Sequence, residues 1–252
     1  LYLACLRSGL VYHPLNTAYQ AAELDYFLTD AEPVIVVCRG AAAPLFETLA
    51  ARAGVKQVLT LEADGSGSLT AAAGGCATSF ETVSRQRNDL AALLYSSGTT
   101  GRPKGIMLSH GNLASNGRSL VQLWGFTASD VLLHVLPIFH VHGLFVATHC
   151  VLLSGARMRW LDKFDARQVS LNLPHCTVMM GVPTYYTRLL AEPTFGRQAC
   201  AKMRLFISGS APLLPETFAA FEHRTGHTIL ERYGMTETGM NTSNPLRGER
   251  RP

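Results

Sequence analysis

The stretch from residue 33 to residue 61 decides the fold class, because two strand patterns flank one helix pattern there. It opens with Pro33-Val34-Ile35-Val36-Val37-Cys38, an unbroken and largely β-branched apolar run that is typical of a buried parallel strand. Residues 41–53 place apolar side chains at helical spacing, and residues 57–61 form a second strand pattern. This alternation predicts an α/β fold of layered sheets with flanking helices.

The same alternation continues on both sides of that stretch. Upstream, the sequence predicts helices over residues 2–10 and 21–29 and a short strand over residues 11–14. Residues 62–76 are rich in Gly, Ser and Ala and predict a surface loop. Downstream strands are expected at residues 90–95, 131–136, 157–161, 177–181, 205–208 and 228–233. Downstream helices are expected at residues 113–124, 142–153, 165–172, 183–191 and 215–225.

Composition excludes several classes of protein. With 47% apolar and 16% charged residues in 252, the chain is not disordered. Its net charge of +4 is too small to indicate a nucleic-acid partner. The apolar runs fall short of the roughly 18 residues that span a bilayer. The six cysteines form no C-x-x-C pair, which indicates reduced core thiols and a cytoplasmic location.

The run Tyr95-Ser96-Ser97-Gly98-Thr99-Thr100-Gly101-Arg102-Pro103-Lys104-Gly105 carries the clearest chemical signal. It follows an apolar strand and precedes a polar helix start. Its glycines permit unusual backbone turns, so that amide and hydroxyl donors can face one concavity with a lysine at the rim. Polyphosphates need such donors, although the spacing does not match a Walker A loop. The run therefore predicts a polyphosphate-binding loop.

Two further segments follow strand patterns, at the edge where ligand crevices of α/β sheets open. The first is Ser208-Gly209-Ser210-Ala211-Pro212, whose small residues can lie flat against a planar ring. The second is Glu231-Arg232-Tyr233-Gly234-Met235-Thr236-Glu237. In it, Tyr233 can stack on a base and Glu237 can hold a metal ion that bridges phosphates.

These motifs together resemble the adenylate-forming superfamily, which includes acyl-CoA synthetases, peptide-synthetase adenylation domains and luciferases. Residues 95–105 resemble its phosphate loop, and residues 136–143, 209–212 and 233–237 follow in the family's order. The resemblance covers nearly the whole chain. It implies that residues 1–252 are the central part of the large AMP-binding domain, without its N-terminal start and without the small C-terminal lid domain.

The resemblance also implies roles for individual residues. Ser96, Ser97, Gly98, Thr99, Thr100, Gly101 and Lys104 would hold the β- and γ-phosphates of ATP. Thr236 would contact the α-phosphate, and Glu237 would ligate Mg²⁺. The adenine ring would be enclosed by Gly209, Ser210, Ala211, Pro212 and Tyr233, and Gly234 and Met235 would also belong to the nucleotide site. The implied reaction joins a carboxylic acid to CoA through an acyl-adenylate, with Lys104, Thr236 and Glu237 stabilising charge on the phosphates.

The identity of the acid depends on Arg232, with His140 and Ser210 as further substrate-pocket residues. A guanidinium in an acyl pocket is uncompensated unless the substrate carries a second carboxylate. Residues 203–212 and 231–245 look most like malonyl-CoA synthetases within the superfamily, which implies malonate or methylmalonate. One alternative is that Arg232 caps local structure or pairs with Glu231, in a CoA ligase for short-chain or aromatic monocarboxylates. Another is a nucleotide-binding fragment without activity, and we expect residues 1–252 alone not to form acyl-CoA at an enzymatic rate.

Overall fold

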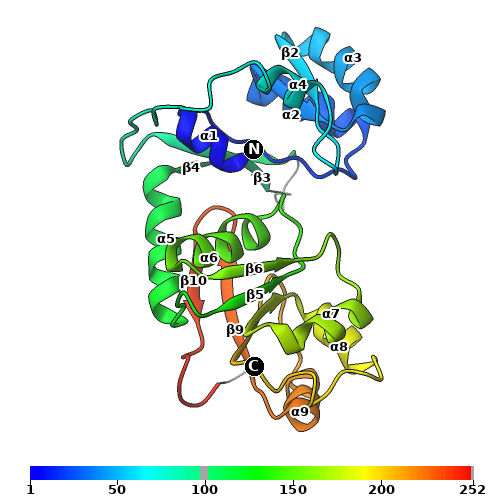
Figure 1. The fold of residues 1–252 in the computed structure, drawn as a ribbon, viewed down its shortest axis with the longest axis vertical. Helices are drawn as coiled ribbons and strands as arrows, with labels where there is room; N and C mark the ends of the chain where they lie inside the picture. Colours follow the sequence, from blue (N-terminus) through cyan, green and yellow to red (C-terminus); the bar gives the residue numbers. More distant parts are fainter. Residues whose placement is uncertain (97–101, 251–252) are drawn as a thin grey trace. The chain divides into compact units, whose positions relative to one another are not determined.

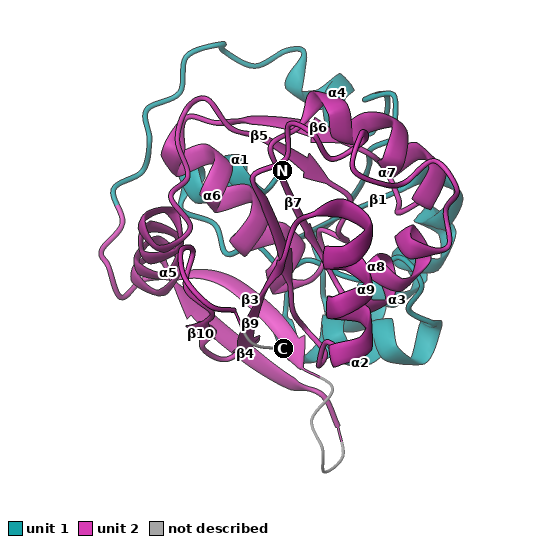
Figure 2. Cartoon of the chain, turned by 90° about the horizontal axis from the view of Figure 1, so that it is seen from below, with its two compact units in different colours: residues 1–84 teal, residues 85–252 magenta. Residues whose placement is uncertain are grey.

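The computed structural model describes residues 1–96 and 102–250 and divides the chain into two compact units. Unit 1 comprises Leu1–Ser84 and unit 2 comprises Arg85–Pro252, and Figure 2 draws them in teal and magenta. The sequence analysis treats the chain as one continuous stretch of a domain and does not predict this boundary. Both units combine strands and helices, as the predicted α/β class requires.

Unit 1 is a small layer of helices on a two-stranded parallel sheet. Its elements are α1 (Tyr2–Ser8), α2 (Ala21–Ala31), β1 (Ile35–Cys38), η1 (Gly40–Ala42), α3 (Ala43–Ala53), β2 (Gln57–Thr60) and α4 (Ser68–Ala73). Strands β1 and β2 pair in parallel, with Val36 opposite Val58. Leu24 and Leu28 of α2 pack with Val36 and with Leu49 of α3 in one buried cluster. The amphipathic spacing of α2 and α3 therefore builds this core.

Three predictions for unit 1 are wrong in detail. Residues 11–14 form no strand, because only Tyr12 makes an isolated bridge. Residues 62–76 are not wholly loop, since α4 lies within them. The run 33–38 is a parallel strand but is not buried throughout, because Val34 is 58% and Ile35 44% exposed.

Unit 2 contains the remaining elements. They are β3 (Leu90–Ser96), β4 (Lys104–Ser109), α5 (His110–Leu123), β5 (Val131–His134), η2 (His142–Ala147), α6 (Thr148–Ser154), β6 (Arg157–Trp160), α7 (Ala166–Asn172), η3 (Leu173–His175), β7 (Val178–Gly181), α8 (Pro183–Leu190), β8 (Leu205–Ser208), α9 (Pro215–Thr225), β9 (Ile229–Met235) and β10 (Gly239–Ser243). Every downstream strand and helix that the sequence predicts has a counterpart here. The sequence analysis missed β4 and β10, and η2 is a π-helix at the start of a predicted α-helix.

The main sheet has the strand order β10-β9-β8-β7-β5-β6 and is parallel except for β10, while β3 and β4 form a separate antiparallel pair. Strand β5 lies between β6 and β7, so the chain reverses its direction across the sheet at β5. Figure 1 shows α5 and α6 on one side of this sheet and α7, α8 and α9 on the other. A reversal with helices on both faces creates a crevice at the carboxyl ends of the strands, where ligands bind in such folds.

A row of apolar side chains runs across four strands beneath α8 and α9. Leu133 pairs with Met179, Met179 with Phe206, and Phe206 with Ile229, and all four lie in one buried cluster. The ring of Phe206 meets that of Phe221 on α9 edge-on, with centroids 4.9 Å apart. Dense packing of this kind makes the sheet a rigid frame for the loops at its edge.

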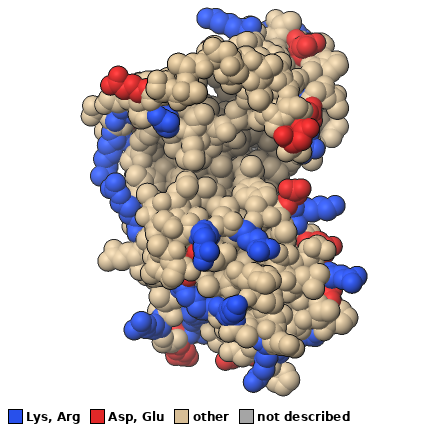
Figure 3. All heavy atoms as spheres, viewed as in Figure 1, with Lys and Arg blue, Asp and Glu red and all other residues tan. Residues whose placement is uncertain are grey.

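The surface fits the composition. The face drawn in Figure 3 is mostly uncharged, with basic and acidic side chains in small separate groups. Within the described residues, no helix is both long and apolar enough to cross a membrane. All six cysteines are free thiols, but only Cys150, Cys176 and Cys200 are buried, so the prediction of core thiols is wrong for the exposed Cys76 and for the half-buried Cys5 and Cys38.

Candidate functional site

Residues from three separate segments meet at the carboxyl end of β8. Ser208 ends β8 and pairs in register with Glu231 of β9, so the turn Gly209–Pro212 lies beside Arg232. His142, the first residue of η2, reaches the same place from the chain that follows β5. The predicted substrate residues Arg232 and Ser210 are therefore neighbours, although 21 positions of sequence separate them.

Position 209 leaves no room for a side chain unless the Arg232 guanidinium moves. A Cβ at position 209 would collide with the guanidinium carbon and lie 2.5 Å from two of its nitrogens. The next residue, Ser210, has a φ of 71°, in the left-handed region that non-glycine residues seldom adopt. A close approach followed by a strained residue is the kind of geometry that functional turns retain.

Arg232 is a buried cation without an acidic partner. Its exposed fraction is 4%, its Nε has no hydrogen-bond partner, and its only polar contact in the described chain is a long one of 3.5 Å to Ser210 Oγ. The alternative partner Glu231 is used elsewhere, since its Oε1 accepts the Leu213 backbone N–H at 3.0 Å. Burial lowers the pKa of Arg232 from 12.5 to about 10. The guanidinium thus remains charged at neutral pH, in a place that favours an anion.

His142 is a second buried polar group at this point. Its Nδ1 lies 3.4 Å from Ser210 Oγ, and its Nε2 is buried without a partner. Burial, the charge of Arg232 and the neighbouring His134 together hold the pKa of His142 well below 6.5. His142 is therefore neutral, and one ring nitrogen remains to donate to or accept from a ligand. Ser208 Oγ is likewise buried and unpartnered.

His142 begins the π-helix η2, whose second residue, Gly143, is held by two side chains. The Gly143 carbonyl accepts hydrogen bonds from His134 Nε2 at 2.9 Å and from Thr148 Oγ1 at 3.1 Å. A Cβ on Gly143 would collide with the Pro137 carbonyl, so this close turn requires glycine. Single π-turns within α-helices occur frequently at functional sites.

His140 was the histidine predicted for the acid pocket, whereas His142 was not predicted. His140 is exposed, and its ring lies against Phe139 with centroids 4.5 Å apart. The signal that could have found His142 is the His-x-His spacing before Gly143, which places two imidazoles near the entry of one helix. The role of His140 in the acid pocket stays a prediction.

The predicted nucleotide residues of the second segment lie on the β9–β10 hairpin. β9 continues to Met235, so Tyr233, Gly234 and Met235 are within the strand rather than beyond its end. Tyr233 is 58% exposed, which leaves its ring face available for stacking. The Thr238 N–H donates to the Met235 carbonyl at 3.3 Å and closes the turn that carries Thr236 and Glu237.

The predicted phosphate loop is described only at its two ends. Ser96 ends β3 and pairs with Lys104, the first residue of β4, so the two flank the loop on an antiparallel hairpin. Lys104 is exposed, as a phosphate ligand needs to be. Ser97, Gly98, Thr99, Thr100 and Gly101 lie outside the described residues, and their predicted roles remain predictions.

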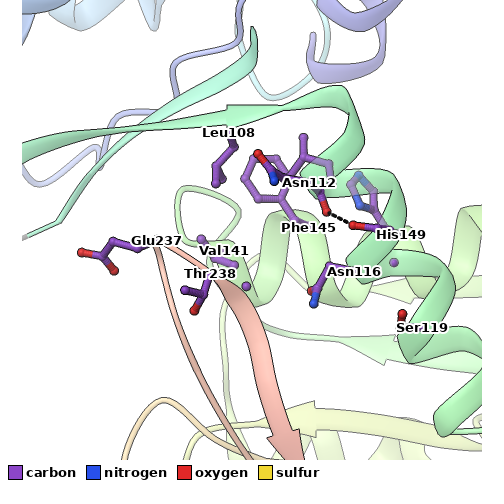
Figure 4. Close-up of a pocket in the computed structure, with 13 residues that line it drawn as sticks. Leu108, Asn112, Asn116, Ser119, Val141, Phe145, His149, Glu237 and Thr238 are labelled. Carbon is purple, nitrogen blue, oxygen red and sulfur yellow. Dashed lines mark hydrogen bonds between the residues drawn. The ribbon is translucent and has the colours of Figure 1, made fainter. Parts of the chain in front are cut away.

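A cavity of about 210 Å³ lies between α5, the η2–α6 segment and the β9–β10 turn. Figure 4 shows Asn112 and Asn116 reaching into it from α5, opposite Glu237 and Thr238. On the helix that faces α5, Val141, Phe145 and His149 recur every four residues, which aligns them along one face. The cavity therefore adjoins the turn that carries the predicted metal ligand.

Glu237 suits a magnesium ion that binds together with phosphates. Its carboxylate is exposed on the turn, and no group of three or more His, Cys, Asp or Glu side chains among the described residues could hold a metal. Mg²⁺ is commonly bound by one or two carboxylates, water and substrate phosphates rather than by an all-protein cage. The residues present fit that mode of binding.

Comparison with known proteins gives the family and close relatives. Residues 1–252 match the family described as AMP-binding enzyme. The mitochondrial malonate–CoA ligase of Mus musculus is 40% identical over 97% of this chain and 44% of its own length. The malonate–CoA ligase of Arabidopsis thaliana is 36% identical over 96% of this chain and 43% of its own length.

Solved structures agree with the sequence relatives. ATP-bound MatB from Rhodopseudomonas palustris has a TM-score of 0.97 at 56% identity and is matched over 100% of this chain and 50% of its own. A malonyl-CoA ligase in a product complex with methylmalonyl-CoA and AMP has a TM-score of 0.84 at 33% identity, over 99% of this chain and 52% of its own. The chain thus spans about half the length of the proteins that it matches.

Proposed function

Since the chain belongs to the AMP-binding enzyme family, we propose that it supplies the nucleotide- and acid-binding surfaces of an ATP-dependent malonate–CoA ligase. The single observation that carries the choice of malonate is the buried guanidinium of Arg232, which has no carboxylate partner among the described residues and lies near neutral His142. The names of the similar proteins, malonate–CoA ligases among them, support the same choice.

Malonate has two carboxylates, of which one is bound by the pocket and the other reacts with ATP. One carboxylate pairs with Arg232 and accepts hydrogen bonds from His142 and Ser210, which compensates the buried charge. The other is left to attack the α-phosphorus of ATP, which gives an acyl-adenylate and pyrophosphate. A monocarboxylate of equal size leaves the buried guanidinium without a paired anion, so the site disfavours the monocarboxylate.

The nucleotide is held by residues of the β3–β4 hairpin, of the turn after β8 and of the β9–β10 turn. Lys104 and the phosphate loop bind the β- and γ-phosphates, and Thr236 binds the α-phosphate. Glu237 would hold a Mg²⁺ ion, which would supply positive charge to the phosphates. The turn Gly209–Pro212 and the exposed ring of Tyr233 enclose adenine. Positive charge placed where the phosphates develop charge lowers the barrier to adenylation.

Coenzyme A is the proposed thiol that displaces AMP in the second step. A solved relative carries methylmalonyl-CoA and AMP together, which supports CoA as acceptor and methylmalonate as a second acid. In this proposal residues 1–252 are the central part of the large AMP-binding domain, and the protein is cytoplasmic.

The test is pyrophosphate exchange by a full-length protein that contains this chain. Labelled pyrophosphate should enter ATP only when malonate or methylmalonate is present, and CoA should then yield the thioester. Exchange driven equally by propionate or benzoate would favour the monocarboxylate alternative. No exchange with any acid, despite ATP binding, would favour the inactive nucleotide-binding fragment.

A further inference from the structure

Helix α5 is tied to the β9–β10 hairpin at two places. The side-chain amide of Asn116 donates to the Met240 carbonyl at 3.1 Å, and its Oδ1 accepts the Met240 N–H at 3.3 Å. Near the end of the helix, Trp124 Nε1 donates to Ser243 Oγ at 3.0 Å. The two tethers lie eight residues apart on α5, about 12 Å along its axis.

The Asn116 tether holds an irregular part of the hairpin. Gly239 has a φ of 69°, and the pairing register of β9 and β10 shifts between Met240 and Thr242. A Cβ on Gly239 would lie 2.8 Å from Asn116 Oδ1, so the hairpin approaches this side chain as closely as glycine permits. A bulge breaks the regular ladder, and the amide of Asn116 supplies both backbone bonds that Met240 makes to α5.

Helix α5 also fixes the other half of the proposed ATP site. It begins at His110 directly after β4, the strand that starts with Lys104. Its first turn is locked by a capping box, in which Asn112 N donates to Ser109 Oγ at 3.1 Å and Ser109 N to Asn112 Oδ1 at 2.9 Å. The helix therefore connects the Lys104 hairpin rigidly to Asn116.

We propose that Asn116 is a positioning residue, which sets the turn bearing Thr236 and Glu237 at a fixed distance from the Lys104 hairpin and so presents both to one Mg·ATP. This rests on the proposed nucleotide roles of those three residues. Figure 4 shows Asn116 on α5 facing the turn that carries Glu237 and Thr238. The reason for its effect is geometric. Phosphate ligands that are no longer held at the correct distance bind Mg·ATP less tightly and also slow the reaction.

The experiment compares Asn116→Leu, which keeps the branched shape but removes both hydrogen bonds, with Ser243→Ala, which removes the distant tether. Both are made in a full-length protein that contains this chain. Binding of ATP in excess MgCl₂ is measured by calorimetry, and melting temperature is recorded for each. Asn116→Leu should raise the Kd for Mg·ATP by about tenfold, the worth of one to two hydrogen bonds. Ser243→Ala should change it less than about twofold.

One further variant and one further readout keep the inference falsifiable if Asn116→Leu folds poorly. Asn116→Asp retains the acceptor for Met240 N–H and should give an intermediate Kd. Amide exchange at Met240 should speed up in Asn116→Leu, which removes the acceptor of the Met240 N–H, and much less in Asn116→Asp or Ser243→Ala. A Kd unchanged in folded Asn116 variants, with melting temperatures lowered as in Ser243→Ala, would show that Asn116 only stabilises the fold.

The outcome is separable from that of the proposed function. Mg·ATP binding is measured without any carboxylic acid, so it decides the role of Asn116 whichever acid the protein uses. Malonate-dependent exchange by the wild type decides the substrate. Normal malonate exchange with unaltered Mg·ATP affinity in Asn116→Leu would overturn only the positioning role.

Discussion

The guanidinium of Arg232 lies against the backbone of Gly209, in the space that a Cβ would occupy. This contact joins the end of β8 to a buried charge on β9, and it accounts for the small-residue turn that follows β8. Any side chain at position 209 has to displace the guanidinium or separate the two strands.

Gly209→Ala should therefore impair both stability and malonate use. Overpacking at this point should cost about 1–3 kcal/mol of unfolding free energy. We expect kcat/KM for malonate to fall by at least about tenfold, because the guanidinium moves. Gly196→Ala is the matched control, since the nearest atom to its added Cβ is 4.0 Å away. Urea unfolding and steady-state kinetics measure both effects, and equal behaviour of the two variants would refute the packing claim.

His142 should affect the recognition of malonate more than His140 does. His142→Ala removes a buried imidazole beside Ser210 and Arg232, and we expect the malonate KM to rise by about tenfold, the value of a hydrogen bond to a charged group. His140→Ala should reduce the preference for malonate by less than Arg232→Ala does. Malonate and propionate kinetics of the three variants provide the check. A larger loss of preference in His140→Ala than in His142→Ala would restore the sequence-based assignment.

Stability should fall as the pH drops below about 6.5, because buried histidines must charge on unfolding. Burial lowers the pKa of His149 from 6.5 to about 4, and a backbone hydrogen bond to Leu113 raises it in part. A depressed pKa in the folded state means that the contribution of His149 is complete above 6.5 and is lost toward pH 4. The expected loss at pH 4.5 relative to pH 7.5 is about 2–3 kcal/mol.

His149→Phe tests that dependence, since it keeps a ring beside Phe145 and removes the titration. Urea unfolding at both pH values should show a smaller difference for the variant than for the wild type. His142 contributes in the same direction, so some dependence should remain. An undiminished pH difference in a folded His149→Phe protein would show that His149 is not responsible.

Lys104 should act on the rate of adenylation rather than on acid binding. Lys104→Ala removes a cation that faces the leaving pyrophosphate, where charge develops, and kcat for exchange should fall by about 100- to 1,000-fold. Arg102→Ala, two positions away and also exposed, controls for loss of local charge. Exchange kinetics and malonate KM separate the two effects. An exchange rate in Lys104→Ala like that in Arg102→Ala would show that the lysine is not a phosphate ligand.

Long, strongly patterned elements were predictable from the sequence. Helix α9 has the predicted bounds of residues 215–225, and β8 those of residues 205–208, because proline, apolar spacing and flanking glycines mark their ends. Strands β4 and β10 were not predictable, since Lys104 to Ser109 and Gly239 to Ser243 lack an alternating apolar pattern. They exist through pairing with β3 and β9, a tertiary effect that overrides local propensity.

The candidate site was predictable in part for a similar reason. The motifs and the family resemblance named Arg232, Ser210 and the β9–β10 turn. The His-x-His spacing marks His142 only as a candidate, because its contact with Ser210 arises in a π-helical segment that the sequence pattern does not reveal. The tether from Asn116 to Met240 spans 124 residues and is visible only in the folded chain. Motifs identify the residues of the site, whereas long-range contacts of this kind determine where their side chains lie.

The central claim is that Arg232 selects a dicarboxylate, and one competition measurement tests it most directly. A full-length protein that contains this chain and its Arg232→Ala variant are offered malonate, succinate, propionate and benzoate, and kcat/KM is compared. The account predicts that the wild type prefers malonate over propionate by at least about 100-fold and that Arg232→Ala loses this preference. Equal use of malonate and propionate by the wild type, or an intact preference in Arg232→Ala, would contradict it.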